Sequence, residues 1–506
     1  MERLSRYEKT GVLLIAPETA QLPDTMGPLA RYIASKSGGL GEVVAALCRG
    51  LVDSGIDCHL ATLCLKRRFQ QECSLDEASW QDLIHRIDPD RIHLVNSSFF
   101  SHLGNAYEGN LQQNAAEFQK QVVNYIITEV RAKHRGRLII HSHDWMAGGV
   151  ITAFARLRGC PVLHTVHNIH TGEMPLEMLS GLELEPLLPY LYFTRDHGHV
   201  DNQATAIKNA DLVSFVSPQF LLEMVDGHFS GESIFGSHIR REIKIKYDHG
   251  ATLAIMNAPS PSLYPENCRH LSVRFGPDDD VLEAKRQNLM EFQRRTGLLV
   301  DPEAILFYWP SRLDSSQKGI HLLEEIAHHF VIAHGDAQIA IVGNGIGPDR
   351  IHEEYCGRIA WSSGGKIAYH RFNEDLSLLG FAAANDVFGA SLYEPCGQID
   401  LMGNLYGATA TNRDTGGYHD KIRELSLTAD GAPEDSGNGF LFRDYDAGGL
   451  WYGLRKSIEF HRRPAAVRET QIKRIMREIR RQSSLDSMVH QYVTAYERLN
   501  GGLPLA

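Results

Sequence analysis

Short runs of apolar residues alternate along the first half of the chain with segments in which apolar residues recur every three or four positions. Runs that are apolar throughout are typical of parallel strands buried on both faces, and the longer period indicates helices that cover those faces. One such helix is predicted over 115–134. The strands expected in this half cover 11–16, 57–65, 91–96, 137–141, 161–167, 212–216 and 251–256.

The segment 257–280, rich in Pro, Ser and Asn, is predicted to be a linker, because the strand and helix alternation restarts after it. Beyond Ala447 the pattern is helical almost to a polar tail at 500–506. Two successive β/α repeats predict an α/β protein with two Rossmann-like domains facing each other across a cleft. The strands expected in the second half cover 304–310, 337–342, 366–371, 386–390, 408–411 and 439–442.

Length and charge support this picture and exclude several classes of protein. A chain of 506 residues exceeds the roughly 250–300 residues that one hydrophobic core holds. The formal net charge is −11 and no basic stripe is present, so we expect neither nucleic acid nor membrane as a partner. The charged N-terminus lacks an apolar signal region, and the eight cysteines form no CxxC pair. These features predict a cytoplasmic protein with reduced thiols.

Two glycine-rich helix starts, one in each half, are candidate phosphate sites. Adjacent glycines let the backbone approach a ligand closely, and the free N–H groups at a helix start favour phosphate. Either motif alone is also compatible with an ordinary turn. Both follow a predicted strand, and their residues are Lys36-Ser37-Gly38-Gly39 and Thr415-Gly416-Gly417.

Charged side chains follow two predicted strands of the second half. Arg312 and Lys318 come after the strand 304–310 and can reach one diphosphate, the arginine as a planar fork and the lysine as a point charge. Glu394 follows the strand 386–390 and can bind sugar hydroxyls or stabilise positive charge. Solvated charges at helix starts are the alternative interpretation for all three residues.

Histidines gather after two strands of the first half, at His141, His143, His164, His167 and His170. A metal site is one interpretation, but positions three apart around a strand end do not converge on one point, and no HExxH or CxxC accompanies them. We therefore predict no metal ligands and expect these rings to hydrogen-bond a polar ligand. The run Val342–Pro348 lacks the third glycine of a dinucleotide fingerprint, so NAD binding is not expected.

Taken in chain order, these motifs resemble those of the glycogen/starch synthase family, which are retaining glycosyltransferases of the GT-B fold that use nucleotide-activated glucose. The Lys-x-Gly-Gly-Leu and Glu-Pro-Cys-Gly motifs together are specific to this family, whereas Arg…Lys-Gly is shared by many GT-B transferases. The matching segments are 36–42, His143-Asp144-Trp145, Thr165–Asn168, Val216-Ser217-Pro218, Asn257, Ser311-Arg312, Gln317-Lys318-Gly319, Glu394–Gly397 and Thr415–Gly417.

The resemblance implies a role for each matching residue. Arg312 and Lys318 would bind the donor diphosphate, Glu394 would contact the donor glucose, and His143 would lie beside the anomeric carbon, which makes these four the predicted catalytic residues. Further donor contacts are implied for Lys36, Gly38, Gly39, Gly345, Cys396, Gly397, Thr415, Gly416 and Gly417, with Phe372 against the nucleotide base. His167, Asn168 and Asn257 would line the acceptor side of the cleft.

The implied domain organisation is an N-terminal Rossmann-like domain over 1–262, a nucleotide-sugar domain over 263–483 and a C-terminal helix over 484–506 that crosses back onto the first domain. No Asp-x-Asp motif stands at a predicted strand end, so no metal or other cofactor is expected. Arg312, Lys318 and the helix starts would balance the charge of the departing nucleotide.

Several positions depart from the family pattern, mostly on the acceptor side. The segment 21–35 looks like an insertion between the first strand and Lys36. The usual Asp-Asn-x-x-Arg-Phe is replaced by Gln113-Asn114-Ala115-Ala116-Glu117-Phe118. Asn257 is followed by Ala258-Pro259-Ser260, His143-Asp144-Trp145 by Met146, and Gly397 by Gln398-Ile399-Asp400. The donor half therefore matches the family better than the acceptor half.

Three functions remain open at this point. The first is extension of an α-1,4-glucan from ADP-glucose or UDP-glucose, and the second is transfer by a related enzyme to a small sugar or sugar phosphate. The third is a catalytically silent glucan-binding paralogue, which has no need to keep Arg312, Lys318, Glu394 and His143 together. The nucleotide base and the oligomeric state leave no pattern in the sequence.

Overall fold

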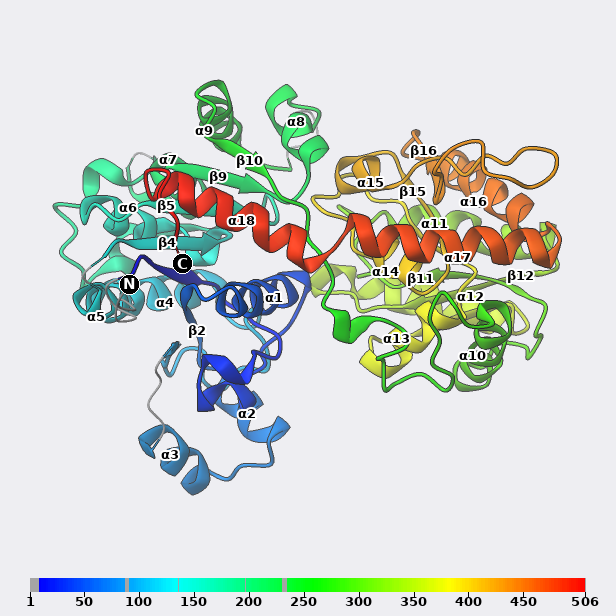
Figure 1. The fold of residues 1–506 in the computed structure, drawn as a ribbon, viewed down its shortest axis with the longest axis horizontal. Helices are drawn as coiled ribbons and strands as arrows, with labels where there is room; N and C mark the ends of the chain where they lie inside the picture. Colours follow the sequence, from blue (N-terminus) through cyan, green and yellow to red (C-terminus); the bar gives the residue numbers. More distant parts are fainter. Residues whose placement is uncertain (1–8, 87–90, 135, 196, 230–233, 506) are drawn as a thin grey trace. The chain divides into compact units, whose positions relative to one another are not determined.

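The structure is a computed structural model that describes residues 9–86, 91–134, 136–195, 197–229 and 234–505 (Figure 1). The chain forms two compact units. Unit 1 comprises residues 1–258 and 485–506, and unit 2 comprises residues 259–484.

Unit 1 is built on a parallel seven-stranded sheet with the order β10-β9-β5-β4-β1-β2-β3. Strand β1 lies between β2 and β4, so the strand order reverses there and a crevice is expected at the carboxyl ends of β1 and β4. The strands are β1 (Gly11–Ile15), β2 (Asp57–Leu63), β3 (Ile92–Val95), β4 (Leu138–His143), β5 (Val162–Val166), β9 (Leu212–Phe215) and β10 (Thr252–Ala254).

Helices cover this sheet, and the residues that face it are mostly Ala, Val, Ile and Leu. The helices of unit 1 are α1 (Gly39–Asp53), α2 (Lys66–Glu72), α3 (Glu77–Arg86), α4 (Leu111–Gln121), α5 (Thr128–Lys133), α6 (Gly149–Leu157), α7 (Asn202–Asn209), α8 (Pro218–Asp226), α9 (Ser237–Asp248) and α18 (Leu485–Leu499).

Two local features of unit 1 differ from the sequence expectation. The helix predicted over 115–134 consists of α4 and α5 joined by a π-helical stretch, Val122–Ile127. A small antiparallel sheet, β6 (Glu173–Pro175), β8 (His199–Asp201) and β7 (Phe193–Thr194), was not predicted. Strands of two or three residues are too short to show a period in the sequence.

The C-terminal helix α18 packs into unit 1 although the rest of unit 1 lies more than 200 residues earlier in the chain (Figure 1). Its buried Tyr496 hydroxyl lies 2.7 Å from Nδ1 of His141 in β4. Gly50 of α1 leaves the space that Val489 of α18 fills, because a β-carbon there would collide with that side chain. The end of the chain is thereby fixed next to the strand that carries His143.

Unit 2 contains a parallel six-stranded sheet with the order β13-β12-β11-β14-β15-β16. Alternate residues of β11 enter different cores, Leu306 and Tyr308 on one face and Phe307 and Trp309 on the other. This explains why the strand is apolar throughout. The strands are β11 (Ile305–Trp309), β12 (Ala337–Val342), β13 (Ile367–His370), β14 (Asp386–Gly389), β15 (Thr409–Arg413) and β16 (Gly439–Phe442).

The helices of unit 2 leave the carboxyl ends of β11 and β14 next to each other at the point where the strand order reverses. They are α10 (Val281–Thr296), α11 (Ile320–Ala333), α12 (Ile351–Ser362), α13 (Glu374–Ala383), α14 (Ile399–Leu405), α15 (Gly416–Lys421), α16 (Ala447–His461) and α17 (Ala465–Gln482). All thirteen strands expected from the sequence are present, which confirms the predicted α/β class.

Candidate functional site

The loops that follow β11 and β14 in unit 2 bring three charged residues of the sequence prediction together. The Nζ atom of Lys318 lies 2.6 Å from Oε2 of Glu394, and both side chains are largely buried. Arg312 donates to Oε1 of Gln317 at 2.9 Å, in the same loop as Lys318, and its side chain is 45% exposed. The Gln317 carbonyl accepts from the Leu392 N–H at 2.8 Å, which joins the two loops.

Glu394 is held in its ionised form. Burial acts to raise the pKa of this carboxyl, but the Lys318 ammonium and nearby hydrogen bonds outweigh burial, so the pKa lies below its usual value. The Ser391 hydroxyl donates to Oε2 at 2.9 Å and the Gly397 N–H donates to Oε1 at 3.3 Å. A fixed negative charge therefore stands beside the cations at this edge of the sheet.

The second glycine-rich helix start packs directly against the Glu394 loop. The Gly417 N–H donates to the Glu394 carbonyl at 2.9 Å. A β-carbon on Gly417 would collide with the carbonyl oxygen of Cys396, and one on Gly416, whose φ is 44°, would collide with that of Glu394. The structure thus accounts for both glycines by close backbone approach, and their contact with a donor stays a prediction.

A buried ion pair supports this loop and was missed by the sequence analysis. Nζ of Lys421 lies 2.9 Å from Oδ1 of Asp400, and it also donates to the Gly397 carbonyl. Burial raises the pKa of Asp400 to about 6, against the opposing effect of Lys421. Neither residue was predicted from the sequence. Asp400 lies in a segment that departs from the family pattern, and Lys421 lies in a charged stretch that resembles the solvated end of a helix.

Phe372 and Gly345 lie at the ends of the neighbouring strands β13 and β12. The Phe372 side chain is 58% exposed, and its backbone N–H donates to Oδ1 of Asn344 at 3.0 Å. The Gly345 N–H donates to Glu353 at 3.1 Å. An exposed aromatic ring at this edge is available for stacking, which is the role the sequence predicts for it.

In unit 1 the carboxyl ends of β4 and β5 carry buried histidines in place of charges. Nδ1 of His143 lies 2.9 Å from Nε2 of His167, and the two rings stack. Burial, followed by the neighbouring imidazoles, holds the pKa of His143 well below its usual value, and burial lowers the pKa of His167 to about 3. His143 is fully buried, whereas His167 is partly exposed, so His167 is the ring that reaches the surface.

Histidines three positions apart in this region take different partners, as the strand geometry predicts. Nδ1 of His164 contacts the Ser142 hydroxyl at 2.8 Å, whereas His167 contacts His143. Asp144 fixes the turn after β5, because its Oδ1 accepts from the N–H groups of His167 at 2.7 Å and Asn168 at 3.2 Å. Burial raises the pKa of Asp144 to about 7.

The first glycine-rich helix start has its N–H groups directed at a carboxylate. Oε2 of Glu18, which follows β1, accepts from the N–H of Gly38 at 3.1 Å and from that of Ser37. Lys36 pairs with Glu42 at 2.7 Å. Burial raises the pKa of Glu18 above its usual value. The sequence analysis missed Glu18, although an acid just after the first strand was a visible signal.

Comparison with known proteins places the chain among enzymes of glucan synthesis. A family model described as the starch synthase catalytic domain matches residues 13–236. The glycogen synthase of Geobacillus thermodenitrificans is 26% identical over 497 residues, which cover 92% of this chain and 95% of that protein. That of Erwinia tasmaniensis is 29% identical over 342 residues, covering 66% and 67%. The chain belongs to the glycogen/starch synthase family.

Solved structures agree on the fold. The catalytic domain of starch synthase IV from Arabidopsis thaliana, bound to ADP and acarbose, matches with a TM-score of 0.76 and 19% identity over 98% of this chain and 99% of that one. A sucrose-phosphate synthase from Thermosynechococcus elongatus matches with a TM-score of 0.59 and 16% identity, over 98% and 100%. This member of the glycogen/starch synthase family therefore has the GT-B fold and is a glycosyltransferase.

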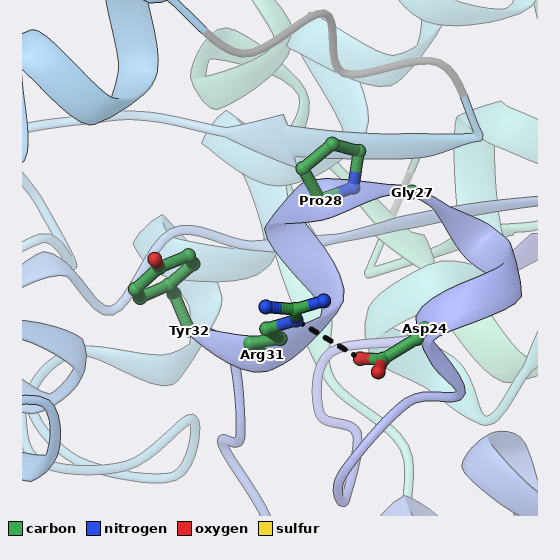
Figure 2. Close-up of a pocket in the computed structure, with 5 residues that line it drawn as sticks. All are labelled: Asp24, Gly27, Pro28, Arg31 and Tyr32. Carbon is green, nitrogen blue, oxygen red and sulfur yellow. Dashed lines mark hydrogen bonds and ion pairs between the residues drawn. The ribbon is translucent and has the colours of Figure 1, made fainter.

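The segment 21–35, which the sequence predicts to be an insertion, is a closed excursion of unit 1. Thr19 and Ser35 pair at its base, with the Ser35 N–H donating to the Thr19 carbonyl at 2.7 Å. Two 3₁₀ turns, Asp24–Met26 and Pro28–Arg31, form its body. They line a pocket of about 260 Å³ that is open to solvent, where the exposed side chains of Arg31 and Asp24 pair at 3.3 Å (Figure 2).

Two further asparagines discussed in the sequence, Asn257 and Asn114, are buried in unit 1. Asn257 is buried next to the last residue of the first segment of unit 1, Ala258. In the altered motif, which lies within α4, the buried Asn114 side chain donates to the Glu108 carbonyl at 2.9 Å. Across the described residues, none of the helices combines the length and apolar character needed to cross a bilayer.

Proposed function

We propose that this protein transfers glucose from ADP-glucose or UDP-glucose to the non-reducing end of an α-1,4-glucan, with retention of the anomeric configuration. The observation that carries the proposal is the cluster of Arg312, Lys318 and Glu394 at the carboxyl ends of β11 and β14. Two cations beside a fixed carboxylate suit a reaction in which a diphosphate leaves and positive charge builds on a sugar ring. Membership of the glycogen/starch synthase family supplies the reaction class.

In this mechanism Arg312 and Lys318 hold the diphosphate and balance its charge as the bond to glucose breaks. Lys318 is already positioned by Glu394 at 2.6 Å, so little reorganisation is needed when the donor binds. Glu394 accepts from sugar hydroxyls and stabilises the positive ring. These groups supply the charge that a metal would otherwise provide, so we propose that no metal takes part in the transfer step.

For unit 1 we propose that His167 contacts the sugar and that His143 positions it. His143 is fully buried and reaches His167 through its Nδ1, whereas His167 is partly exposed. This differs from the sequence-based assignment, which placed His143 beside the anomeric carbon. Lys36, Gly38, Asn168 and Asn257 keep the donor and cleft roles that the family resemblance implies. We also propose that the enzyme acts in the cytoplasm on soluble substrates.

Nucleotide release by the purified protein tests the proposal. ADP-glucose and UDP-glucose are each offered with glycogen, with maltose and without an acceptor, in the presence of EDTA. Release that depends on glycogen is the expected result and identifies the donor. Release with maltose alone would overturn the glucan acceptor, and the pocket over residues 24–32 would become the region to alter.

A matched pair of variants separates catalysis from nonspecific damage. Lys318→Ala removes a cation of the proposed site, and Lys366→Ala removes a partly exposed lysine of the same unit that donates to the Gly335 carbonyl at 2.8 Å. We expect Lys318→Ala to lose its activity and Lys366→Ala to keep the wild-type activity. No release by the wild-type protein, with donor binding intact by calorimetry, would indicate a silent paralogue.

A further inference from the structure

A cluster of two histidines and an aspartate lies in unit 1 at the end of the sheet opposite to the candidate site. Asp57 and His59 belong to the start of β2, and His134 directly follows α5. All three are at most 3% exposed. In the sheet register, Asp57 of β2 pairs with Gly11 of β1, and Gly11 pairs with Leu138 at the start of β4. Leu138 precedes His143 by five residues in the same strand. The cluster and the His143 level are therefore separated by about 16 Å along the strands.

The three inward-facing atoms of this cluster form a nearly equilateral triangle. Oδ2 of Asp57 lies 3.5 Å from Nε2 of His59 and 3.3 Å from Nε2 of His134, and the two nitrogens are 3.5 Å apart. These separations exceed the usual 2.7–3.2 Å of nitrogen–oxygen hydrogen bonds. They match the edge of a tetrahedron around an ion with bonds of about 2.0–2.1 Å, which is about 3.3–3.4 Å.

We propose that Asp57, His59 and His134 bind a structural divalent metal ion, with Zn²⁺ as the natural occupant. Two imidazole nitrogens and one carboxylate oxygen are a donor set that zinc accepts readily, and the fourth position is left for water. The ion would link the first strand position of β2 to the end of α5. It lies away from the proposed transfer chemistry and does not depend on it.

The groups behind the three ligands have the arrangement typical of metal sites. Nδ1 of His59 lies 3.1 Å from Nε2 of His93, and Nδ1 of His134 lies 3.4 Å from the Lys9 carbonyl. Oδ1 of Asp57 lies 3.4 Å from Nε of Arg91. Such outer contacts fix the tautomer and orientation of each ligand, so that both Nε2 atoms face the ion.

The backbone also makes room for the cluster. A β-carbon on Gly11, at the start of β1, would collide with the ring of His134. Gly11 is the residue of β1 that lies opposite Asp57 in the sheet register. Glycine at this position therefore lets the His134 ring reach the space in front of Asp57.

A second cluster in unit 1, Glu173, Asp201 and His238, provides a contrast. Nε2 of His238 lies 2.9 Å from Oδ2 of Asp201, an ordinary hydrogen-bond distance, and Glu173 pairs with Arg195 at 2.9 Å. Asp201 also caps α7 by accepting from the Ala204 N–H at 2.8 Å. Its polar atoms are engaged in bonds of normal length, so we assign no metal there and use His238 as a control.

Metal content of the whole, tag-free protein is the direct test. The protein is incubated with ZnSO₄, passed over a desalting column and analysed by mass spectrometry of the elements. We expect about one zinc per wild-type chain and per His238→Gln chain, and below about 0.2 in His134→Gln and Asp57→Asn. Less than about 0.2 zinc in the wild type, or an unchanged content in both cluster variants, would overturn the proposal.

Spectroscopy on the wild-type protein keeps the test decisive if the cluster variants do not fold. Co²⁺ in place of zinc should give the visible absorption of a tetrahedral ion without a thiolate charge-transfer band. X-ray absorption of the zinc form should show a shell of nitrogen and oxygen at about 2.0 Å. A sulfur shell at about 2.3 Å would place the metal on cysteines and overturn the assignment.

Thermal unfolding separates this inference from the proposed function. Removal of zinc with a strong chelator should lower the unfolding temperature of unit 1 by about 5 °C, and added ZnSO₄ should restore it. Glucosyl transfer measured before unfolding should not change. Chelation that abolishes transfer without changing the unfolding temperature would contradict the structural role and the metal-free transfer step together.

Discussion

The carboxyl edges of the two sheets are built from opposite kinds of polar groups. In unit 2 the loops after β11 and β14 hold ionised side chains, with Lys318 paired to Glu394 and Arg312 exposed beside them. In unit 1 the ends of β4 and β5 hold His143 and His167, both kept neutral by burial. Both units have a parallel sheet covered by helices, so the difference between them lies in the polar groups at the sheet edges and in the ligands that these groups suit.

This contrast follows from the chemistry of the proposed donor. A diphosphate carries charge that must be matched by cations held in place before the bond breaks. A sugar is uncharged, so neutral donors and acceptors can bind it beside the proposed contact from Glu394, and an additional cation there would oppose the positive charge that develops on the ring. This chemistry is the reason for our proposal that unit 2 holds the phosphates and that unit 1 supplies neutral contacts to the sugar.

The largest effect is expected when the fixed negative charge of Glu394 in unit 2 is removed. Glu394→Gln keeps the shape of the side chain but leaves Lys318 without its carboxylate partner. We expect glucosyl transfer to fall about 10²–10³-fold. Steady-state kinetics with the donor identified above measures the effect. Asp336→Asn, which breaks the surface pair with Arg462 in the same unit, is the matched control and should leave the rate unchanged.

The next largest effect is expected at the close backbone contact between the start of α15 and the loop that carries Glu394 and Cys396. Gly417→Ala would place a methyl group against the backbone of Cys396, which cannot move aside as a flexible side chain could. We expect about 3 kcal/mol of destabilisation together with loss of transfer. Gly357→Ala, in α12 with open space around it, should instead stabilise by about 0.5–1 kcal/mol. Urea unfolding of both variants gives the comparison, and equal effects would contradict it.

Acid should affect the two units differently. The pKa values of His141, His143, His164 and His167 in unit 1 are lowered by burial, those of His164 and His167 to about 3. A lowered histidine pKa means that the unfolded chain binds more protons below pH 6.5, so stability is lost as pH falls through that range. Unit 2 has one such residue at a pKa of about 3, His461, among those described.

Buried carboxyls have the opposite effect on stability in acid, and they increase the expected difference between the two units. The pKa is raised by burial to about 7 in Asp144 of unit 1 and Asp386 of unit 2, and to about 6 in Asp400 of unit 2. Because the folded state then binds the extra proton, these groups add stability as pH falls from 7 towards 4. Between pH 7.5 and 5.5 we expect unit 1 to lose about 3 kcal/mol relative to unit 2. Hydrogen exchange in β5 and β14 measures this, and a parallel fall in both would contradict it.

The smallest expected effect concerns the base of the nucleotide. Phe372→Ala removes an exposed ring from unit 2 and should weaken donor binding about 5–10-fold, by loss of stacking worth about 1 kcal/mol. The rate at saturating donor should not change. Trp361→Ala removes a ring that is 89% exposed on the same unit and serves as the control in calorimetry. Equal affinities of the two variants would place the base elsewhere.

Much of the fold was predictable because buried parallel strands leave a strong signal. Strand β11 is the clearest case, because it is apolar throughout and its alternate residues enter two cores. The π-helical stretch Val122–Ile127 and the short strands β6 to β8 were not predicted. Their residues do not depart from ordinary helix or loop composition, so local preference gives no indication of them.

The candidate site was predictable where its residues follow strands, and not where they reach it from elsewhere. Arg312, Lys318 and Glu394 lie in the loops that follow the neighbouring strands β11 and β14, so the strand order brings them together. Lys421 joins the same loop from the end of α15, through contacts that depend on how that helix packs. The sequence predicts that His143 faces the ligand, whereas its full burial and its contact with His167 are the reason for our proposal that His167 takes this role.

The sequence by itself determined the α/β class, the sheet strands, the family and the identity of the charged groups that follow the strands. These properties depend on local period and on motif order, which need no knowledge of distant contacts. The tertiary structure alone decided that Glu18 meets the N–H groups of Gly38 and that Asp57, His59 and His134 face one point. Those residues lie far apart in the chain, and their distances are set by sheet register and helix packing, which no local pattern encodes.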